Sequence, residues 1–262
     1  MIYRSQRAFL GIVALLFAAS AAVTIVWSGS MPATGGMAMP GDWTMSMAWM
    51  RMPGQSWSGA VATFLGMWIV MMVAMMLPSL APMLWRYQRA LCCVVGPGQL
   101  ARLTVFAALG YFFVWAVLGV VAFPLGVGLA TMTMALPTVS RAVPMATGAV
   151  VVIAGALQFS AWKARHLACC RGASGGDEVR NPGFAAAWRH GLRLGIHCTY
   201  CCAGLTAILL VMGVMDLRSM ALVAAAITLE RLAPAGQQVA RIIGGVVIVA
   251  GLFLMLRAGE MA

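Results

Sequence analysis

The sequence predicts an all-α fold, a polytopic bundle of transmembrane helices in which residues 1–262 form a single membrane domain. Three observations predict it. Hydrophobic residues make up 63% of the chain, whereas charged residues make up only 9%. Several apolar stretches approach the ~20 residues that an α-helix needs to cross a bilayer. Small residues within them, such as Gly244, Gly245 and Gly251, favour close packing between membrane helices.

About seven apolar stretches are expected to span the membrane, and the sixth is the shortest because it ends at Glu230 and Arg231. They are 9–27, 60–85, 103–123, 142–161, 196–215, 220–232 and 239–256. The first also resembles a cleavable secretory signal, since Arg4 and Arg7 precede it; cleavage would leave six spans. Its apolar run is longer than the ~7–15 residues of a signal core, which favours an anchored helix.

The basic residues predict the orientation of the chain. With a cytoplasmic N-terminus, 13 of the 17 Lys and Arg residues fall on the cytoplasmic side, as the positive-inside rule requires. This pattern predicts a multi-pass protein of a plasma membrane, in contact with lipid. It also explains the formal charge of +11 without nucleic acid as a partner.

The predicted extracytoplasmic loop, residues 28–58, is rich in Met and Trp. Thioethers are soft, uncharged ligands that suit Cu(I), so this loop fits copper capture; an equally weighted interpretation is contact with lipid head groups. The second span continues the pattern, because Met67, Met71 and Met75 recur at helical spacing. Such a stripe fits either adaptable packing or a path for a soft cation. Pro78 and Pro82 are expected to kink or end that helix.

The predicted basic cytoplasmic loop, residues 162–195, contains His166, Cys169 and Cys170. These residues are three and four positions apart, so a helix would place them on one face. If the loop folds back onto the fifth span, they could complete a metal site there. The alternative is a solvated basic loop with incidental cysteines.

The strongest candidate site opens the fifth span, where His197 is followed by Cys198, Cys201 and Cys202. Helical spacing brings the three thiols together. All seven cysteines fall on the predicted cytoplasmic side, where reducing conditions disfavour disulfides. Cys92 and Cys93 are expected in a short turn without a functional role.

These motifs carry a resemblance. The chain resembles a bacterial family of predicted metal-binding integral membrane proteins from its second span onward. The matching segments are 74–78 with Pro82, 163–171, 197–202, 212–216 and Glu230-Arg231. Where the family pattern has a cysteine three residues after the lysine, this chain has His166, which exchanges one soft ligand for another. The resemblance implies a metal-related membrane protein, often associated with copper handling.

We therefore expect a membrane protein that binds Cu(I) and delivers it to a partner cuproprotein or oxidase. The expected metal ligands are His197, Cys198, Cys201, Cys202, His166, Cys169, Cys170, Met71 and Met75. Spacing alone does not separate copper from zinc, and an oligomer that completes the site stays open. No catalytic signature is present. The alternatives are a membrane thiol–disulfide oxidoreductase, using the Cys198-x-x-Cys201 pair, and a non-catalytic scaffold subunit of a membrane complex.

Overall fold

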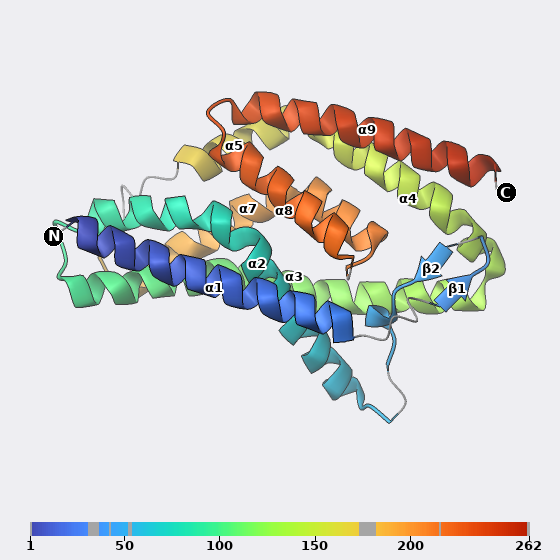
Figure 1. Cartoon of the computed structure of the whole chain (residues 1–262), viewed down its shortest axis with the longest axis horizontal. Coiled ribbons are helices and arrows are strands. Elements are labelled where there is room, and N and C mark those ends of the chain that lie inside the picture. Colours follow the sequence, from blue (N-terminus) through green and yellow to red (C-terminus); the bar gives the residue numbers. More distant parts are fainter. Residues whose placement is uncertain are drawn as a thin grey trace.

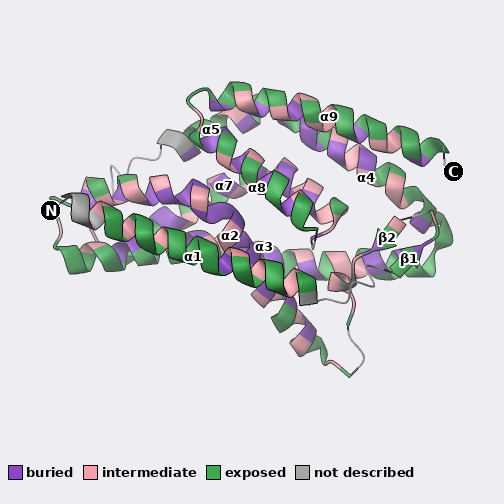
Figure 2. Ribbon diagram, viewed as in Figure 1, coloured by how far each residue is buried: buried purple, intermediate pink, exposed green. Residues whose placement is uncertain are grey.

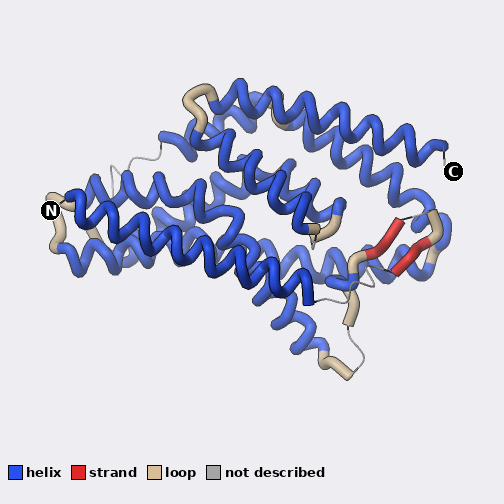
Figure 3. The backbone as a smooth tube through the Cα atoms, viewed as in Figure 1, coloured by secondary structure: helices blue, strands red, loops and turns tan. Residues whose placement is uncertain are grey.

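The computed structural model describes residues 2–30, 37–41, 43–51, 54–172, 182–214 and 216–260. Nearly all of them are helical, apart from one small hairpin, as Figures 1 and 3 show. This confirms the all-α prediction. The helices are α1 (Ile2–Ser30), α2 (Trp57–Leu91), α3 (Pro97–Ala135), α4 (Pro137–Leu157), α5 (Ala161–Gly172), α7 (Phe184–Met212), α8 (Leu217–Leu232) and α9 (Gly236–Glu260). The hairpin strands are β1 (Met37–Met39) and β2 (Trp43–Met45), followed by a short 3-10 helix, Met47–Trp49.

Six helices in the described part of the chain are long and apolar enough to cross a membrane: α1, α2, α3, α4, α7 and α9. The sixth predicted span forms α8, which has 16 residues and is not one of these six. Glycine contacts show that α7 runs parallel to α3 and that α9 runs antiparallel to α4. Helix α4 reverses the direction of the chain after α3 (Figure 1). Helices α7 and α9 therefore run in the same direction, and α8 brings the chain back from the end of α7 to the start of α9.

The helices extend beyond the apolar stretches that predicted them, because polar and proline residues define their ends. Ser56 caps α2 by accepting a hydrogen bond from the Gly59 N–H. Pro97 and Pro137 begin α3 and α4 at the position where a missing N–H costs nothing. The expected loop 162–195 differs most: α5 begins at Ala161, and α7 begins twelve residues before the predicted start of the fifth span.

Helix α2 does not end at its prolines. It continues through Pro78 and Pro82 and changes direction midway along its length (Figure 1). The Ser79 hydroxyl donates to the Met76 carbonyl oxygen at 2.9 Å, so its polar group is satisfied within the helix between the two prolines. Figure 2 shows buried residues along α2, α7 and α8 and exposed faces on α1 and α9. The core therefore lies between α2, α3 and α7.

Helices α3 and α7 pack closely enough that glycine is required at their contact. A Cβ atom on Gly191 would collide with the Ala107 carbonyl oxygen, and one on Gly110 would lie 2.6 Å from the Trp188 carbonyl oxygen. Small residues allow this approach between membrane helices. The contact fixes α7, and with it the cysteines one to three turns further along.

Replacing Gly191 by alanine is therefore expected to destabilise the protein by about 1–3 kcal/mol, because an inserted methyl group must separate two backbones. The matched control is Gly245→Ala, since nothing lies within 4 Å of a Cβ there. Unfolding of both variants in detergent, followed by circular dichroism, tests the prediction. Equal stability of the two variants would contradict the packing described here.

Asp216 caps α8 and makes the helix start sensitive to pH. Its carboxylate accepts hydrogen bonds from the N–H groups of Arg218 and Ser219, at 3.2 and 3.0 Å. These bonds and the Ser219 hydroxyl hold the Asp216 pKa below its usual value, with the hydroxyl as the largest cause. A depressed folded-state pKa means that the cap stabilises the protein above the unfolded pKa and is lost as the pH falls through the folded pKa.

Asp216→Ala is expected to cost about 1 kcal/mol at neutral pH, because two helix N–H groups lose their acceptor. Asp216→Asn keeps an acceptor but removes the titrating charge. The stability advantage of the wild type over Asp216→Asn should therefore shrink below about pH 4. Thermal unfolding from pH 7 downward measures it, and an advantage that grows on acidification would contradict this assignment.

Candidate metal centre

Four buried cysteines meet where α5 packs against α7, and we call them the thiol cluster: Cys170 from α5 and Cys198, Cys201 and Cys202 from α7. The sulfur atoms of Cys198 and Cys202 are 4.0 Å apart. Cys170 and Cys201 form a side-chain hydrogen bond. Each of the four side chains is at most 1% exposed. The two predicted groups of ligands therefore do come together in the fold.

Local sequence explains this convergence. Cys198, Cys201 and Cys202 share the face of α7 that points into the core, since residues three and four apart lie on one side of a helix. Cys170 is presented by the last turns of α5, next to the buried Leu167. The pKa of the Cys170 thiol lies well above its ordinary value, first because of its hydrogen bond with Cys201 and then because of burial.

Two further side chains, from α2 and α3, touch Cys198. The Met76 thioether sulfur lies 4.0 Å from the Cys198 sulfur, and the Tyr111 hydroxyl lies 2.8 Å from it. Both Met76 and Tyr111 are 0% exposed. Met76 is part of the α2 methionine set, of which Met71 and Met75 were the predicted ligands. Met71 and Met75 are also buried, but Met76 is the one that contacts the thiol cluster.

A buried guanidinium lies against the thiol cluster. Arg231 of α8 donates to the sulfurs of Cys170 and Cys202, at 3.6 and 3.7 Å, and to the Ser79 hydroxyl at 3.2 Å. Its side chain is almost fully buried. Glu230 and Arg231 are adjacent in the sequence but have different partners, and it is the cation that reaches the sulfurs.

Glu230 pairs with Lys163 instead. The Lys163 ammonium lies 2.7 Å from one Glu230 carboxylate oxygen, and both side chains are at most 5% exposed. The second carboxylate oxygen has no hydrogen-bond partner among the described residues. This ion pair joins α5 to α8 and so helps to hold Cys170 and Arg231 in place.

The two predicted histidine ligands form a separate pair, half-buried and away from the core. The Nδ1 atoms of His166 and His197 are 3.2 Å apart. His166 also packs against the rings of Trp162 and Tyr200. The remaining candidate, Cys169, is exposed and lies outside the thiol cluster, as do the exposed Cys92 and Cys93.

The described residues contain no three His, Cys, Asp or Glu side chains that already converge as a metal-binding group. Sequence reasoning overlooked Met76, Tyr111 and Arg231 as neighbours of the sulfurs. Met76 stood within the recognised methionine pattern, so the signal existed but did not distinguish it from Met75. Tyr111 carried no signal, and Arg231 stood out only as part of a matching segment, because the contacts of both residues depend on how α3 and α8 pack.

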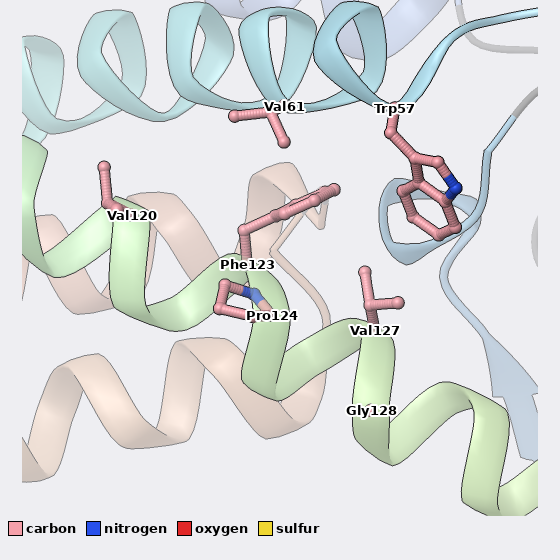
Figure 4. Close-up of a pocket in the computed structure, with 7 residues that line it drawn as sticks. All are labelled: Trp57, Val61, Val120, Phe123, Pro124, Val127 and Gly128. Carbon is pink, nitrogen blue, oxygen red and sulfur yellow. The ribbon is translucent and has the colours of Figure 1, made fainter.

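Two cavities adjoin the helices. One, of about 490 Å³, lies between α2 and α3 and is lined by apolar side chains such as Trp57, Val61 and Phe123 (Figure 4). It offers no side-chain oxygen or sulfur to a metal. The other, of about 900 Å³, extends from the hairpin to α7 and is lined by both polar and apolar residues, including Trp43, Met45 and Thr199.

Comparison with known families adds one finding. No curated protein and no solved structure matches the chain. The model of the PpoB2 family, described as a copper chaperone, matches residues 65–254. That match covers most of the chain, including α2 from its methionines onward, the thiol cluster and Arg231. The chain therefore belongs to the PpoB2 copper chaperone family.

Proposed function

We propose that the thiol cluster binds Cu(I) and that Cys198, Cys202 and Met76 are its central ligands. One observation carries this proposal: the sulfur of Cys198 lies 4.0 Å from both the Cys202 and the Met76 sulfurs. Two sulfurs that each bind one ion at about 2.3 Å lie no more than about 4.6 Å apart. Both sulfur pairs satisfy this limit, so one soft ion can lie between Cys198 and either neighbour, and the proposal is that side-chain rotation brings all three sulfurs to it.

Charge balance supports the same assignment. Arg231 keeps its proton under all physiological conditions, and a buried charge is costly without a counter-charge. Its hydrogen-bond partners in the described structure are two sulfurs and a hydroxyl rather than a carboxylate. A thiolate in the cluster would neutralise it. Two thiolates together with Arg231 and one Cu(I) sum to zero charge, which suits a site without access to water.

The donor set favours copper over zinc. Thioether sulfur is a ligand for Cu(I), whereas structural zinc takes four thiolate or imidazole ligands. Imidazoles are nearby, but the contacts of His166 are with His197, Trp162 and Tyr200 rather than with a sulfur. A zinc site made of the thiol cluster alone would need all four cysteines as thiolates, which leaves a net negative charge in the core even with Arg231 beside them.

The buried methionines of α2 extend from the periphery toward the thiol cluster. Trp49, in the loop, packs against Phe64 at the start of this row, with ring centroids 5.2 Å apart. Met67, Met71 and Met75 follow, all at most 5% exposed, and Met76 ends the row at Cys198. We assign the row as a relay that passes Cu(I) inward for delivery to a partner cuproprotein or oxidase.

The basic residues support a cytoplasmic N-terminus in a bacterial inner membrane. The end of α2, the start of α3 and the start of α7 lie together, because Gln88 bonds Thr104 and the Tyr87 and His190 rings stack at 4.8 Å. Arg86, Arg89, Arg102, Arg189 and Arg193 belong to these ends. Reporter fusions at both termini and at the hairpin test this orientation; a cytoplasmic hairpin would overturn it.

A metal-uptake experiment tests the proposed function. The protein is purified anaerobically in detergent, incubated with equal Cu(I) and Zn(II), and desalted before mass spectrometry of bound metals. Near-stoichiometric copper with little zinc is expected. Deletion of the gene in its host should also lower the copper content of membrane cuproproteins. A preference for zinc, or metal-free protein, would contradict the proposal.

The thiol–disulfide oxidoreductase interpretation is disfavoured by burial. Reactive thiols in such enzymes are partly exposed, so that a partner thiol can attack. Cys198 and Cys201 are at most 1% exposed and lie beneath α2 and α5. Reversible formation of a Cys198–Cys201 disulfide with a glutathione buffer would restore this alternative.

A further inference from the structure

The methionine-rich hairpin, β1 and β2, lies against the turn between α3 and α4 and is held there by hydrogen bonds (Figure 1). The Ser140 hydroxyl donates to the Pro40 carbonyl oxygen at 2.9 Å, and the Trp43 indole N–H donates to the Ser140 carbonyl oxygen at 3.0 Å. Gly41 has a φ of 103°, which permits the tight connection between the strands. These contacts hold the strands in one place on the bundle.

The hairpin register gathers its soft side chains on one face. Met37 is paired with Met45, and Met39 is paired with Trp43. Directly opposed residues share a face of an antiparallel pair, and residues two apart along a strand share it as well. Met37, Met39, Met45 and Trp43 therefore project from the same side, with opposed Cβ atoms about 4.5–5.5 Å apart.

This face is largely sealed against α3. Met39 and Met45 are 9% and 3% exposed and form a small cluster with Ala130, with Trp43, Trp49 and Met50 packed around it. Met37 is 42% exposed, so one thioether of the set stays accessible from outside. The Thr133 hydroxyl lies 3.8 Å from the Met45 sulfur. The surroundings are neutral, sulfur-rich and aromatic.

We propose that Met37, Met39 and Met45 form a second metal site, which takes Cu(I) through three thioethers with the Trp43 ring over the ion. Thioethers prefer Cu(I), keep their affinity in an oxidising compartment and need no deprotonation. An indole face attracts a cation within about 6 Å of its centroid. The accessible Met37 receives the ion, and the buried Met39 and Met45 retain it.

The larger cavity extends from this site to α7, where it reaches the residue next to Cys198. Met45, Trp43 and Trp49 line one end of the 900 Å³ cavity, and Thr199 and Ala203 of α7 line the other. Thr199 follows Cys198 directly, and its buried hydroxyl has no hydrogen-bond partner among the described residues. Copper captured at the hairpin thus reaches α7 next to a thiol-cluster residue. This step deepens the proposed function, whereas metal binding at the hairpin is independent of it.

The test uses silver(I), an air-stable substitute for Cu(I), and the full-length protein in detergent, labelled with 13C on its methionine methyl groups. Met37, Met39 and Met45 resonances are assigned from single Met→Leu variants, which preserve side-chain volume. Once the cysteine thiols have bound silver, further added silver should shift these three resonances together. The control is Met132, which is exposed on α3 and should not shift.

A second measurement uses a chain in which all seven cysteines are serine. It should bind one silver ion, and Met39→Leu with Met45→Leu should weaken that binding at least tenfold, while Met132→Leu should not. Unshifted hairpin resonances, or unchanged binding in the double variant, would overturn the proposal. If the cysteine-free chain does not fold, the resonances of the wild type decide. Failure of the thiol cluster to bind copper would leave both hairpin results intact.

Discussion

Exchanging Cys201 and Cys202 for serine, in protein whose hairpin site is removed by Met39→Leu with Met45→Leu, is expected to reduce bound copper from near-stoichiometric to background. The change removes Cys202, a proposed ligand 4.0 Å from Cys198, and Cys201, which hydrogen-bonds Cys170. A hydroxyl is a hard ligand and does not replace a thiolate toward Cu(I). Mass spectrometry of protein purified anaerobically measures the loss.

Folding must be separated from binding in this comparison. Serine is close to cysteine in size, so gel filtration and circular dichroism should show a folded double variant. Cys92→Ser with Cys93→Ser is the matched control, because these two cysteines are exposed at the end of α2. Retained copper in the Cys201 and Cys202 variant, or equal losses in both variants, would rule out the thiol cluster as the binding site.

The second large effect concerns the buried ion pair. Glu230→Leu is expected to destabilise the folded protein by about 3–5 kcal/mol, because it leaves the Lys163 ammonium buried without a counter-charge. The Lys163–Glu230 pair is a buried ion pair, because its charged atoms are 2.7 Å apart and both side chains are buried. Chemical unfolding in detergent micelles, followed by circular dichroism, measures the change.

The double variant Lys163→Met with Glu230→Leu distinguishes the charge from the packing. Removing both charges should recover most of the lost stability, since apolar residues often replace a buried pair without cost. Arg231 and the sulfurs are unchanged in it, so copper binding should return together with stability. A double variant as unstable as Glu230→Leu would show that the side chains matter for shape rather than for charge.

Much of the fold was predictable because apolar length is a direct consequence of the bilayer. The spans follow from runs such as 239–256, and the close contacts of Gly244 and Gly251 with α4 confirm the small-residue prediction. For Gly245 the prediction was wrong, because none of the described residues lies within 4 Å of a Cβ there. The helix ends were less predictable. Hydropathy did not register α5 or the first turns of α7, because Arg189 and Arg193 lower the apolar signal in a segment that is nevertheless helical.

The candidate site was predictable where ligands share one helix. The convergence of Cys198, Cys201 and Cys202 follows from their spacing alone. The sequence predicted that Cys170 would approach these thiols if the loop 162–195 folded back onto the fifth span. The contact of α5 with α7 shows that it does. The position of Arg231 could not be foreseen, because it depends on the rotation of α8, and an isolated arginine near a helix end is usually solvated.

X-ray absorption at the copper edge of the Cu(I)-loaded protein tests the central claim most directly. If the thiol cluster and Met76 hold the ion, the spectrum should show Cu(I) with a first shell of two or three sulfur atoms. In protein that also carries Met39→Leu and Met45→Leu, the sulfur shell should disappear when Cys198, Cys201 and Cys202 are serine. A first shell of nitrogen or oxygen alone in the wild type would contradict the account and transfer the copper to the His166 and His197 pair.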